Sequence, residues 1–452
     1  MAAGLEIRRA LPDREAGIRR EDSAVGRSMQ GKLQHPAGGG RDFRTRPAGA
    51  DGDRVKFGIF YEHQIPRPWD DESEYRILQE SLDQIELADR LGFDYAWEVE
   101  HHFLEEYSHS SAPEVFLAAA SQRTQRIRLG HGIVQLTTNH PARVAERVST
   151  LDLISHGRVE LGIGEGSSVT ELHPFDRRFR EKRAVWEDAV RALIPMFTKT
   201  AWEYHGEYFD FPLRNVLPKP RQKPHPPLWV ACSQFETIEM AGRRGLGVLA
   251  FQFIGAEMAK AWVHTYYNAL TKRLDKLADY PVNPQIAVVS QFMCAETDEE
   301  AQRRAEGASF FQFALVFYNR HGPVVPGSIS LWDEYLKWRE TDEGRKTSAA
   351  SRGLIGSPAT LRERLRKFRD SNIDQVILIN QTGKNSAEHI CESLELFARE
   401  VMPEFHADEE AHQAWKKSVL AGDTLLEEID PSSMTPISLQ SPKWKAEREG
   451  RG

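Results

Sequence analysis

The stretch IRLGHGIVQLTTNHPARVAERVSTLDLISHGRVELGIGEG, residues 127–166, decides the fold class. Its first ten residues form a short apolar run that is typical of a buried strand. Pro141 then begins a segment with apolar residues at helical spacing, at the first helical position, which tolerates proline. A second apolar run at 157–166 predicts another strand. The stretch as a whole therefore predicts a strand, a helix and a strand.

The same alternation continues on both sides of this stretch. Strands are predicted over 55–61, 93–99, 127–136, 157–166, 226–232, 246–251, 285–295 and 374–380. Helices are predicted over 75–92, 113–124, 141–155, 181–198, 236–245, 256–274, 298–318, 357–371 and 386–402. Eight strands that alternate with helices predict an α/β fold, a (β/α)8 TIM barrel. An open doubly wound sheet is the alternative, although no GxGxxG follows the first strand.

Three segments interrupt or flank this alternation. Residues 1–53 are rich in Arg, Gly, Pro and Asp and predict a disordered extension, because they bury too little apolar surface to offset the ordering entropy. The barrel domain is predicted over 54–403, and residues 404–452 predict a helix followed by a tail. Residues 319–352 are long for a connection, so they predict an insertion between the seventh and eighth strands.

The composition argues against several classes of protein. The 67 acidic residues outnumber the 59 basic ones, and the formal net charge of -8 argues against nucleic acid as a partner. The three cysteines are widely spaced and form no CxxC, which fits a reducing compartment and predicts a cytoplasmic protein. The sequence has neither a long apolar run nor a secretory h-region, so it predicts no membrane span and no signal peptide.

The candidate site follows the second strand, in the stretch WEVEHHFLEEY at 97–107. In a barrel the carboxyl end of a strand opens onto the catalytic face, so Glu100, His101 and His102 are site candidates. Neighbouring strand-end histidines point to opposite sides, and the chain has no HExxH, so no metal site is predicted. The pattern favours a histidine that works by hydrogen bonding or proton transfer. The alternative is one core histidine and one solvated histidine.

Three stretches together resemble bacterial luciferase and its flavin-dependent monooxygenase relatives: EHHF at 100–103, residues 139–166, and ACSQFETIEMAGRRG at 231–245. The resemblance extends over residues 55–402. It implies a (β/α)8 barrel that binds reduced FMN at the carboxyl ends of its strands. It further implies that a partner flavin reductase supplies the reduced FMN, that O2 is the co-substrate, and that a C4a-peroxyflavin attacks the substrate.

The resemblance also assigns roles to residues of this sequence. His101 matches the first histidine of EHHF and would be the catalytic acid/base, with His102 as its structural neighbour. Gly132 and Ile133 match the strand beneath the isoalloxazine ring, where a non-prolyl cis peptide is expected. Such a bond costs about 3–4 kcal/mol and persists only where function or packing enforces it. The glycine would also let the backbone approach the flavin closely.

The phosphate end of the flavin needs cations and backbone N–H groups. Arg183 matches a family arginine at the start of the fourth helix, and Ser233 matches a serine after the fifth strand; the alternative for Arg183 is a solvated charge. Glu165 replaces an arginine of the luciferases, so it would need an arginine such as Arg183 beside it. Gly164 replaces a reactive cysteine, so light emission is not implied. Glu165 and Cys232, which stands where luciferase has a glutamate, are candidate cofactor contacts.

The remaining candidates concern the flavin loop and the substrate. Asn139 would shape the loop above the flavin, with an ordinary helix start as the alternative. Aromatic residues would line a substrate cavity, with plain core as the alternative: Phe60, Tyr61, Phe103 and Trp332. Such walls predict a small hydrophobic organic substrate, such as an aldehyde, a terpene or an aromatic compound.

Three functions are compatible with the sequence. The favoured one is an FMNH2-dependent monooxygenase, the oxygenase component of a two-component system, because an acid/base serves no purpose in flavin storage. The alternatives are a deazaflavin-dependent oxidoreductase and a non-catalytic flavin-binding protein. A homodimer is predicted. Residues 319–352 are predicted to be a mobile lid, since Trp332, Tyr335 and Trp338 recur at helical spacing; a surface helix or a dimer contact is the alternative.

Overall fold

The computed structural model describes residues 55–251, 254–272, 274–321, 324–350, 353–406 and 409–429. The extension predicted over 1–53 lies outside the described residues, and so does the end of the predicted tail.

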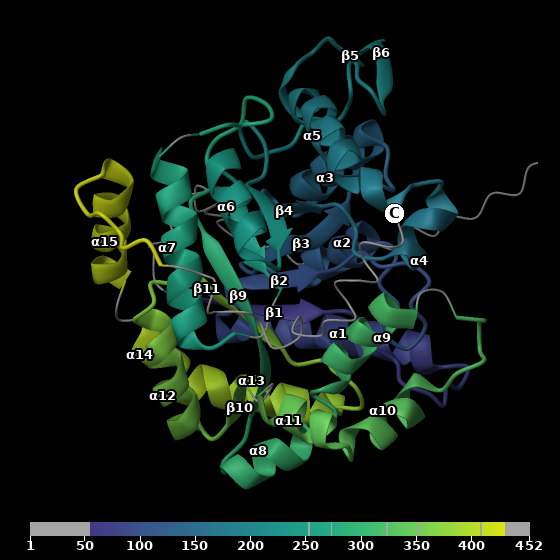
Figure 1. Ribbon diagram of the computed structural model, residues 1–452, viewed down its shortest axis with the longest axis vertical. Coiled ribbons are helices and arrows are strands. Elements are labelled where there is room, and N and C mark those ends of the chain that lie inside the picture. The colour runs from purple at the N-terminus through teal and green to yellow at the C-terminus, as the bar shows by residue number, and fades with distance from the viewer. Residues whose placement is uncertain are drawn as a thin grey trace, which may run out of the picture. The chain divides into compact units, whose positions relative to one another are not determined.

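Among the described residues, eight parallel strands close into a barrel (Figure 1). Each strand pairs with the next in the order β1-β2-β3-β4-β7-β8-β9-β11, and β11 pairs with β1 to close the ring. The strands are Lys56–Tyr61 (β1), Tyr95–Glu98 (β2), Arg128–Gln135 (β3), Val159–Gly164 (β4), Leu228–Cys232 (β7), Gly247–Ala250 (β8), Ile286–Cys294 (β9) and Gln375–Ile379 (β11). The predicted (β/α)8 fold and its eight strands are confirmed.

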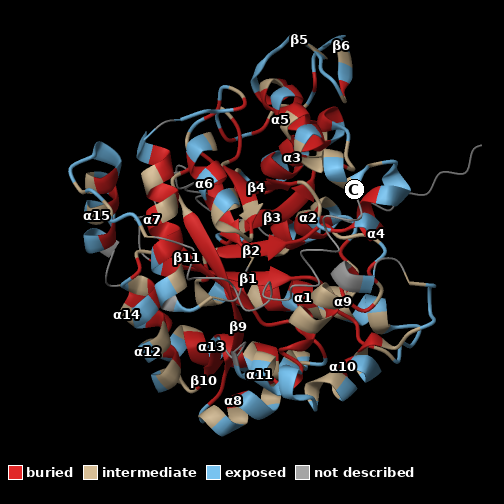
Figure 2. Cartoon of the chain, viewed as in Figure 1, coloured by how far each residue is buried: buried red, intermediate tan, exposed pale blue. Residues whose placement is uncertain are grey.

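Helices surround the barrel, and Figure 2 shows buried strands within a layer of helices whose outer faces are exposed. Helix α1 illustrates how the sequence sets an end, because Gly92 adopts φ 91° and its N–H closes the helix onto the Ala88 and Asp89 carbonyls. The principal helices are α1 (Ser73–Leu91), α2 (Pro113–Arg123), α3 (Pro141–Ile154), α5 (Lys182–Thr198), α6 (Phe235–Arg244), α7 (Ala256–Lys272), α12 (Pro358–Arg369) and α13 (Ala387–Glu400).

The core has two parts because strand side chains alternate between the barrel interior and the surrounding helices. The outer part packs the strands against the helices. In the inner part Trp97 lies between Tyr95 and Trp229, with ring centroids 5.7 and 5.4 Å away. A Cβ at Gly130 would lie 2.2 Å from the Trp97 ring, so only glycine fits there. Bulky aromatic side chains therefore fill the barrel, and the site must lie at its mouth.

Several elements differ from the sequence expectation. The helix predicted over 298–318 is broken into α8 (Asp298–Arg304) and α9 (Phe310–His321). Between β9 and β11 the chain also forms α10 (Leu331–Arg339), α11 (Asp342–Ala350) and β10 (Leu354–Gly356), which pairs with β9. The hairpin of β5 (Trp202–His205) and β6 (Asp210–Arg214) was not predicted.

Short and terminal elements complete the description. They are α4 (Val169–Leu172), the 3-10 turns His173–Phe175 and Phe179–Glu181, α14 (Met402–His406) and α15 (Glu409–Ala421). Across the described ranges, every helix is too short or too polar to cross a membrane.

Candidate active site

The candidate site lies where four neighbouring strands end. Glu62 follows β1 directly, His101 stands three residues after β2, Gln135 ends β3, and Glu171 belongs to α4, which follows β4. Because these strands are parallel and adjacent, their carboxyl ends share one edge of the barrel. The fold therefore brings together four side chains that are far apart in the chain.

The His101 ring lies between two carboxylates. Its Nδ1 is 2.7 Å from Oε1 of Glu171, and its Nε2 is 3.6 Å from Oε2 of Glu62. Glu171 is held in turn by the side-chain amide of Gln135, which donates to Oε1 at 2.8 Å, and by the hydroxyl of Ser168, which donates to Oε2 at 2.9 Å. The His101 side chain is 16% exposed, whereas both carboxylates are buried. The imidazole is thus fixed on one side and accessible on the other.

The three groups have different protonation. Burial alone would lower the pKa of His101, but the charges of Glu171 and Glu62 raise it to about 9. Burial alone would raise the pKa of Glu171, but the charge of His101 and its hydrogen bond, with those of Gln135 and Ser168, lower it to about 2. Burial raises the pKa of Glu62 to about 7, against the opposing effects of His101 and Tyr107. At neutral pH the site therefore holds an imidazolium, a carboxylate and a carboxyl group in mid-titration.

The ring of the second histidine contacts a different carboxylate, with His102 Nε2 3.0 Å from Oε1 of Glu100. Gln135 joins the two carboxylates, because its side-chain amide donates to the Glu100 carbonyl and to Glu171. Glu100 also accepts a hydrogen bond from the side-chain amide of Asn139 at 2.7 Å, and Arg147 donates to Oδ1 of Asn139 at 2.6 Å. Asn139 therefore ties the end of β3 to the histidine loop. Nowhere in the described ranges do three or more His, Cys, Asp or Glu side chains gather in a way that fits a metal ion.

Strand β3 carries the predicted flavin-face residues Gly132 and Ile133. The pairing of β3 with β4 shifts its register between His131 and Val134, so these two residues lie in an irregularity of the strand. The cis peptide bonds of the described residues all precede prolines, so the expected cis bond at Gly132–Ile133 is wrong. The Gly132–Ile133 peptide is therefore trans, at the point where the pairing of β3 with β4 shifts.

The predicted phosphate residues form a charged cluster. Glu165 Oε1 lies 2.5 Å from Nε of Arg183, and Glu165 Oε2 lies 3.8 Å from Nζ of Lys182. The arginine that Glu165 needs is therefore beside it. Two cations surround one carboxylate, so the cluster carries a net positive charge that suits an anion.

Ser233 and Cys232 stand at the end of β7, near this cluster. The Ser233 N–H donates to Oγ1 of Thr237 at 3.2 Å, next to the N-terminus of α6. The Cys232 thiol is buried against the Thr237 carbonyl at 3.3 Å. Burial raises the pKa of Cys232 to about 12, and the charges of Arg183 and Glu165 act on it as well. The thiol is therefore protonated and serves as a packed neighbour of the charged cluster.

The four candidate substrate residues lie in different places. Phe60 is buried inside the barrel, 5.3 Å from the ring of Phe251 and 6.4 Å from that of Phe311 on α9. Tyr61 points to the helices, where its hydroxyl donates to Gln84 at 3.1 Å, so contrary to expectation it does not face the barrel interior.

The other two candidates lie farther out. Phe103 is 57% exposed, with φ 64°, and packs against Phe175. Trp332 lies on α10 with its ring 5.2 Å from that of Phe310, next to the inner cluster. Of the four candidates, Phe60 alone lies within the buried inner cluster, and Trp332 packs on its margin.

The loop after β2 also holds the insertion. The buried carboxylate of Glu106 accepts the backbone N–H groups of Leu331 at 2.6 Å and Trp332 at 3.0 Å, which begin α10. Glu105 accepts the N–H of Gly327 at 2.9 Å. Tyr107 donates to Glu62 at 3.0 Å. A single short loop therefore contacts both the insertion and the carboxyl group beside His101.

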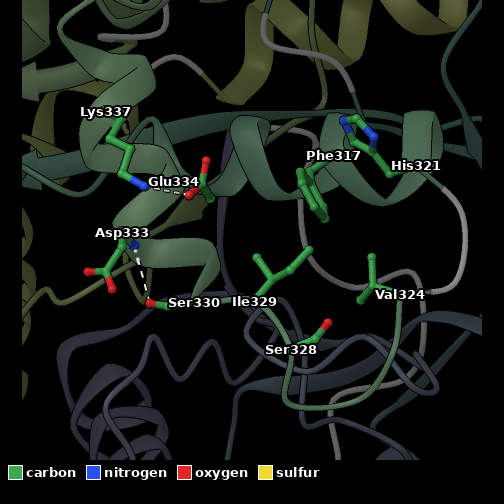
Figure 3. Close-up of a pocket in the computed structure, with 9 residues that line it drawn as sticks. All are labelled: Phe317, His321, Val324, Ser328, Ile329, Ser330, Asp333, Glu334 and Lys337. Atoms are coloured by element: carbon green, nitrogen blue, oxygen red, sulfur yellow. Dashed lines mark hydrogen bonds and ion pairs between the residues drawn. The ribbon is translucent and has the colours of Figure 1, made fainter.

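A separate hollow of about 520 Å³ lies between α9 and α10 (Figure 3). Figure 3 shows the rings of Phe317 and His321 on one side and the Lys337–Glu334 ion pair, at 2.7 Å, on the other. Its lining includes no residue predicted for the cofactor, the substrate or catalysis.

Sequence reasoning singled out His101 as a candidate but did not identify three residues that lie beside it: Glu62, Glu171 and Tyr107. Glu62 comes directly after the first strand, so its position at a barrel strand end was the available signal. Tyr107 belongs to the stretch already singled out at 97–107. Glu171 had no such signal, because its contact with His101 joins residues 70 apart in the chain.

Comparison with known proteins gives consistent matches. Residues 55–375 match the family described as luciferase-like monooxygenase. The chain is 38% identical over 377 residues to the limonene 1,2-monooxygenase of Rhodococcus erythropolis, covering 78% of this chain and 88% of that protein. It is 27% identical over 363 residues to the oxygenase component of a flavin-dependent trigonelline monooxygenase of Acinetobacter baylyi, covering 78% of this chain and 96% of that protein.

A solved structure supports the same relationship. The monooxygenase RslO1 of Streptomyces bottropensis matches with a TM-score of 0.65 and 26% sequence identity. The match covers 78% of this chain and 100% of that one.

Proposed function

This chain belongs to the luciferase-like monooxygenase family and is a flavin-dependent monooxygenase, and from that premise we propose that it is the oxygenase component of a two-component system. A separate flavin reductase supplies reduced FMN, and one atom of O2 enters a hydrophobic organic substrate. The observation that carries this proposal is the His101 imidazolium at the barrel mouth, fixed by Glu171 and reachable from outside. The trigonelline relative is itself an oxygenase component, which supports a reductase partner.

The residues at the mouth fit FMN. A Cβ at Gly132 would be in ordinary van der Waals contact with Trp97 at 3.6 Å, so this position packs against the side chains that fill the barrel. The side-chain oxygen of Gln135 is buried and has no hydrogen-bond partner among the described residues, so a ligand N–H would satisfy it. The positive cluster of Lys182, Arg183 and Glu165 suits a phosphate. We propose that Gly132 and Ile133 support the ring system and that Arg183 and Ser233 hold the phosphate.

Reduced FMN, when bound, supplies the two electrons that activate O2. The chain itself supplies a proton and excludes water. We propose that His101 donates from Nε2 to an oxygen atom of the reaction, while Glu171 fixes the ring through Nδ1. Phe60 and Phe311 pack in the buried inner cluster beneath the mouth, which limits the access of water from the barrel side.

The substrate class rests on that lining and on relatives. The aromatic side chains of the inner cluster support a hydrophobic compound such as an aldehyde, a terpene or an aromatic. The terpene named for the Rhodococcus relative is consistent with this class. The predicted homodimer and cytoplasmic location rest on the sequence, and sedimentation and cell fractionation test them.

The test uses the purified full chain with FMN, NADH and a general flavin reductase under 18O2. Limonene and decanal are the hydrophobic probes, and trigonelline is the polar comparison. We expect one 18O atom in the product of a hydrophobic probe and tighter binding of reduced than of oxidised FMN. Conversion that needs reduced deazaflavin and no O2 would replace the proposal with an oxidoreductase. Binding of reduced FMN that leaves its reaction with O2 unchanged would replace it with a flavin carrier.

A further inference from the structure

Glu62 has a buried carboxyl group, and one of its two oxygens lacks a hydrogen-bond partner among the described residues. Its side chain is 2% exposed. Oε1 accepts the hydroxyl of Tyr107 at 3.0 Å. Oε2 has no hydrogen-bond partner among the described residues and lies 3.6 Å from Nε2 of His101, longer than a hydrogen bond. A buried carboxylate oxygen without a partner is costly, so this atom requires either a proton or a ligand.

The charges around Glu62 favour a proton on it. The titratable groups that face it are His101 and Tyr107 from the loop after β2, Glu171 from α4 and Glu98 from the end of β2. His101 is one cation and Glu171 already balances it. Burial raises the pKa of Glu98 well above its usual range, so Glu98 is a neutral neighbour. Ionised Glu62 would therefore be a second anion for one cation in a buried site.

We propose that Glu62 acts through His101 as its proton-exchange partner, an inference that rests on the function proposed above. When His101 gives its Nε2 proton to an oxygen of the reaction, the O–H bond at Oε2 of Glu62 breaks and an N–H bond forms at Nε2. The imidazolium is restored, and Glu62 is left as a carboxylate that takes a proton from water before the next turnover. Glu62 is a positioning residue in this scheme, since it reaches the reaction through His101.

The two carboxylates beside His101 thus divide the work. Glu171 accepts hydrogen bonds on both oxygens from Gln135 and Ser168, so it stays ionised and fixes the ring. Glu62 has an oxygen to spare, so it carries the exchangeable proton. Environments that separate the pKa values of paired carboxyl groups are a recurrent way of assigning acid and anchor. The group that titrates near neutrality is then Glu62, and His101 remains cationic between turnovers.

The first test uses the flavin-free protein, so it is independent of the proposed function. Glutamate carboxyl 13C spectra are recorded against pH for the wild type and for Glu62→Gln. We expect one carboxyl with a pKa of about 7 that is missing from Glu62→Gln. We expect the histidine 15N signals of His101 to titrate at about 9 in the wild type and lower in Glu62→Gln, because the charge of Glu62 raises that pKa.

Matched variants separate this role from a structural one. Tyr107→Phe should raise the pKa of Glu62, because the Tyr107 hydrogen bond lowers it. The exposed Glu74, which pairs with His109, provides the control, and Glu74→Gln should change neither the Glu62 nor the His101 titration. If Glu62→Gln fails to fold, the Tyr107→Phe shift decides. A Glu62 carboxyl that titrates at its ordinary value, or one that Tyr107→Phe leaves unmoved, overturns the proposal.

The second test measures steady-state turnover with a continuous supply of reduced FMN and a substrate identified as above, because Glu62 restores the His101 proton only after His101 has given it up. The wild-type rate should fall as the pH rises above about 7, as Glu62 loses the proton that it gives to His101. Glu62→Gln should lower the rate about 10²-fold at pH 7 and abolish that inflection. An unchanged inflection in Glu62→Gln contradicts the exchange. If the wild type forms no product, the proposed function fails, and the flavin-free titration still decides the role of Glu62.

Discussion

Each end of the barrel buries a carboxylate beside a histidine, and the two ends treat it differently. At the amino ends of the strands, Oδ1 of Asp374 lies 2.8 Å from Nζ of Lys416 and 3.0 Å from Nε2 of His412, both on α15. Its Oδ2 accepts the Tyr267 hydroxyl at 3.0 Å and the Ile286 N–H at 2.7 Å. At the carboxyl ends, Oε2 of Glu62 has no such donor among the described residues.

The number of donors decides what each carboxylate does. Lys416 and His412 outweigh the effect of burial and hold the pKa of Asp374 well below its usual range, so this group stays ionised and fixes α15 to the barrel. Burial outweighs the few partners of Glu62 and raises its pKa to about 7. A carboxylate whose two oxygens both accept hydrogen bonds adds rigidity, whereas a carboxyl group with an oxygen that lacks a partner keeps an exchangeable proton. A buried acidic residue beside a histidine thus stabilises the fold at one end of the barrel and forms part of the candidate site at the other.

The largest effect should come from removing the histidine at the mouth. His101→Ala should lower product formation by about 10²–10⁴ and leave reduced-FMN binding in place, because a general acid supplies about that much. His412→Ala is the counterpart at the other end, and it should lower the melting temperature with turnover per folded molecule preserved. Full turnover in His101→Ala, or a lost turnover in His412→Ala, would erase the distinction between the two ends.

The next effect concerns Asp374, the fully hydrogen-bonded carboxylate. Asp374→Ala should lower the free energy of unfolding by about 3–5 kcal/mol, because it removes the counter-charge of a buried cation. Urea denaturation measures this. Asp275→Asn is the control, since the Asp275 carboxylate in its ion pair with Arg244 is 66% exposed, and the substitution should change the free energy by about 1 kcal/mol or less. Equal effects of the two substitutions would show that burial of the Asp374 cluster contributes nothing.

The pH dependence of stability sharpens the comparison further. The unfolded chain releases the Glu62 proton near the ordinary value of 4.5, whereas the folded protein keeps it to about 7. Between these values the unfolded state binds fewer protons, so this group makes stability fall as the pH rises. Glu171, with its pKa lowered to about 2, acts in the opposite direction and loses its contribution as the pH falls from 4.5 towards 2.

Glu62→Gln should therefore gain stability relative to the wild type as the pH rises from 5 to 8. Glu171→Gln should lose stability relative to the wild type at neutral pH and converge with it in acid. Urea unfolding at three pH values measures both. Parallel curves for the wild type and Glu62→Gln would contradict the raised pKa.

The smallest expected effect tests whether the mouth opens while the other end stays closed. We propose that residues 319–352 act as a lid, and Glu106→Gln should weaken their hold by about 1 kcal/mol, the usual value of a helix N-terminal contact. Limited proteolysis should cut within 319–352 faster in this variant than in the wild type. Reduced FMN with substrate should protect the segment, and cleavage near α15 should not change. Cleavage in 319–352 that ignores both the ligand and the variant would contradict the lid.

The sequence predicted the barrel because each strand is a separate apolar run between helices, a pattern that depends on local periodicity. The β5–β6 hairpin was not predicted because its alternate residues are exposed and give no apolar run. The Tyr61 expectation ignored alternation, since consecutive residues Phe60 and Tyr61 must point to opposite sides of a strand.

Only part of the candidate site could be predicted from the sequence, for a physical reason. A histidine after a strand is a rare and readable signal, whereas a single glutamate after a strand is common. The partnership of His101 with Glu171 depends on which loops the closed barrel brings together, and no local pattern contains that information. The non-prolyl cis peptide was carried over from the resemblance, and a register shift in β3 takes its place.

The attachment of α10 to Glu106 sets a boundary for engineering. A designer who exchanges residues 319–352 between relatives, to change which compounds enter, would naturally cut at the flanking strands. Such a chimera would satisfy the buried carboxylate of Glu106 only if the new segment placed two backbone N–H groups where those of Leu331 and Trp332 lie. The unit to exchange is therefore discontinuous, and residues 319–352 must be exchanged together with the stretch Glu105–Tyr107. Otherwise the exchange will disturb the loop that carries His101.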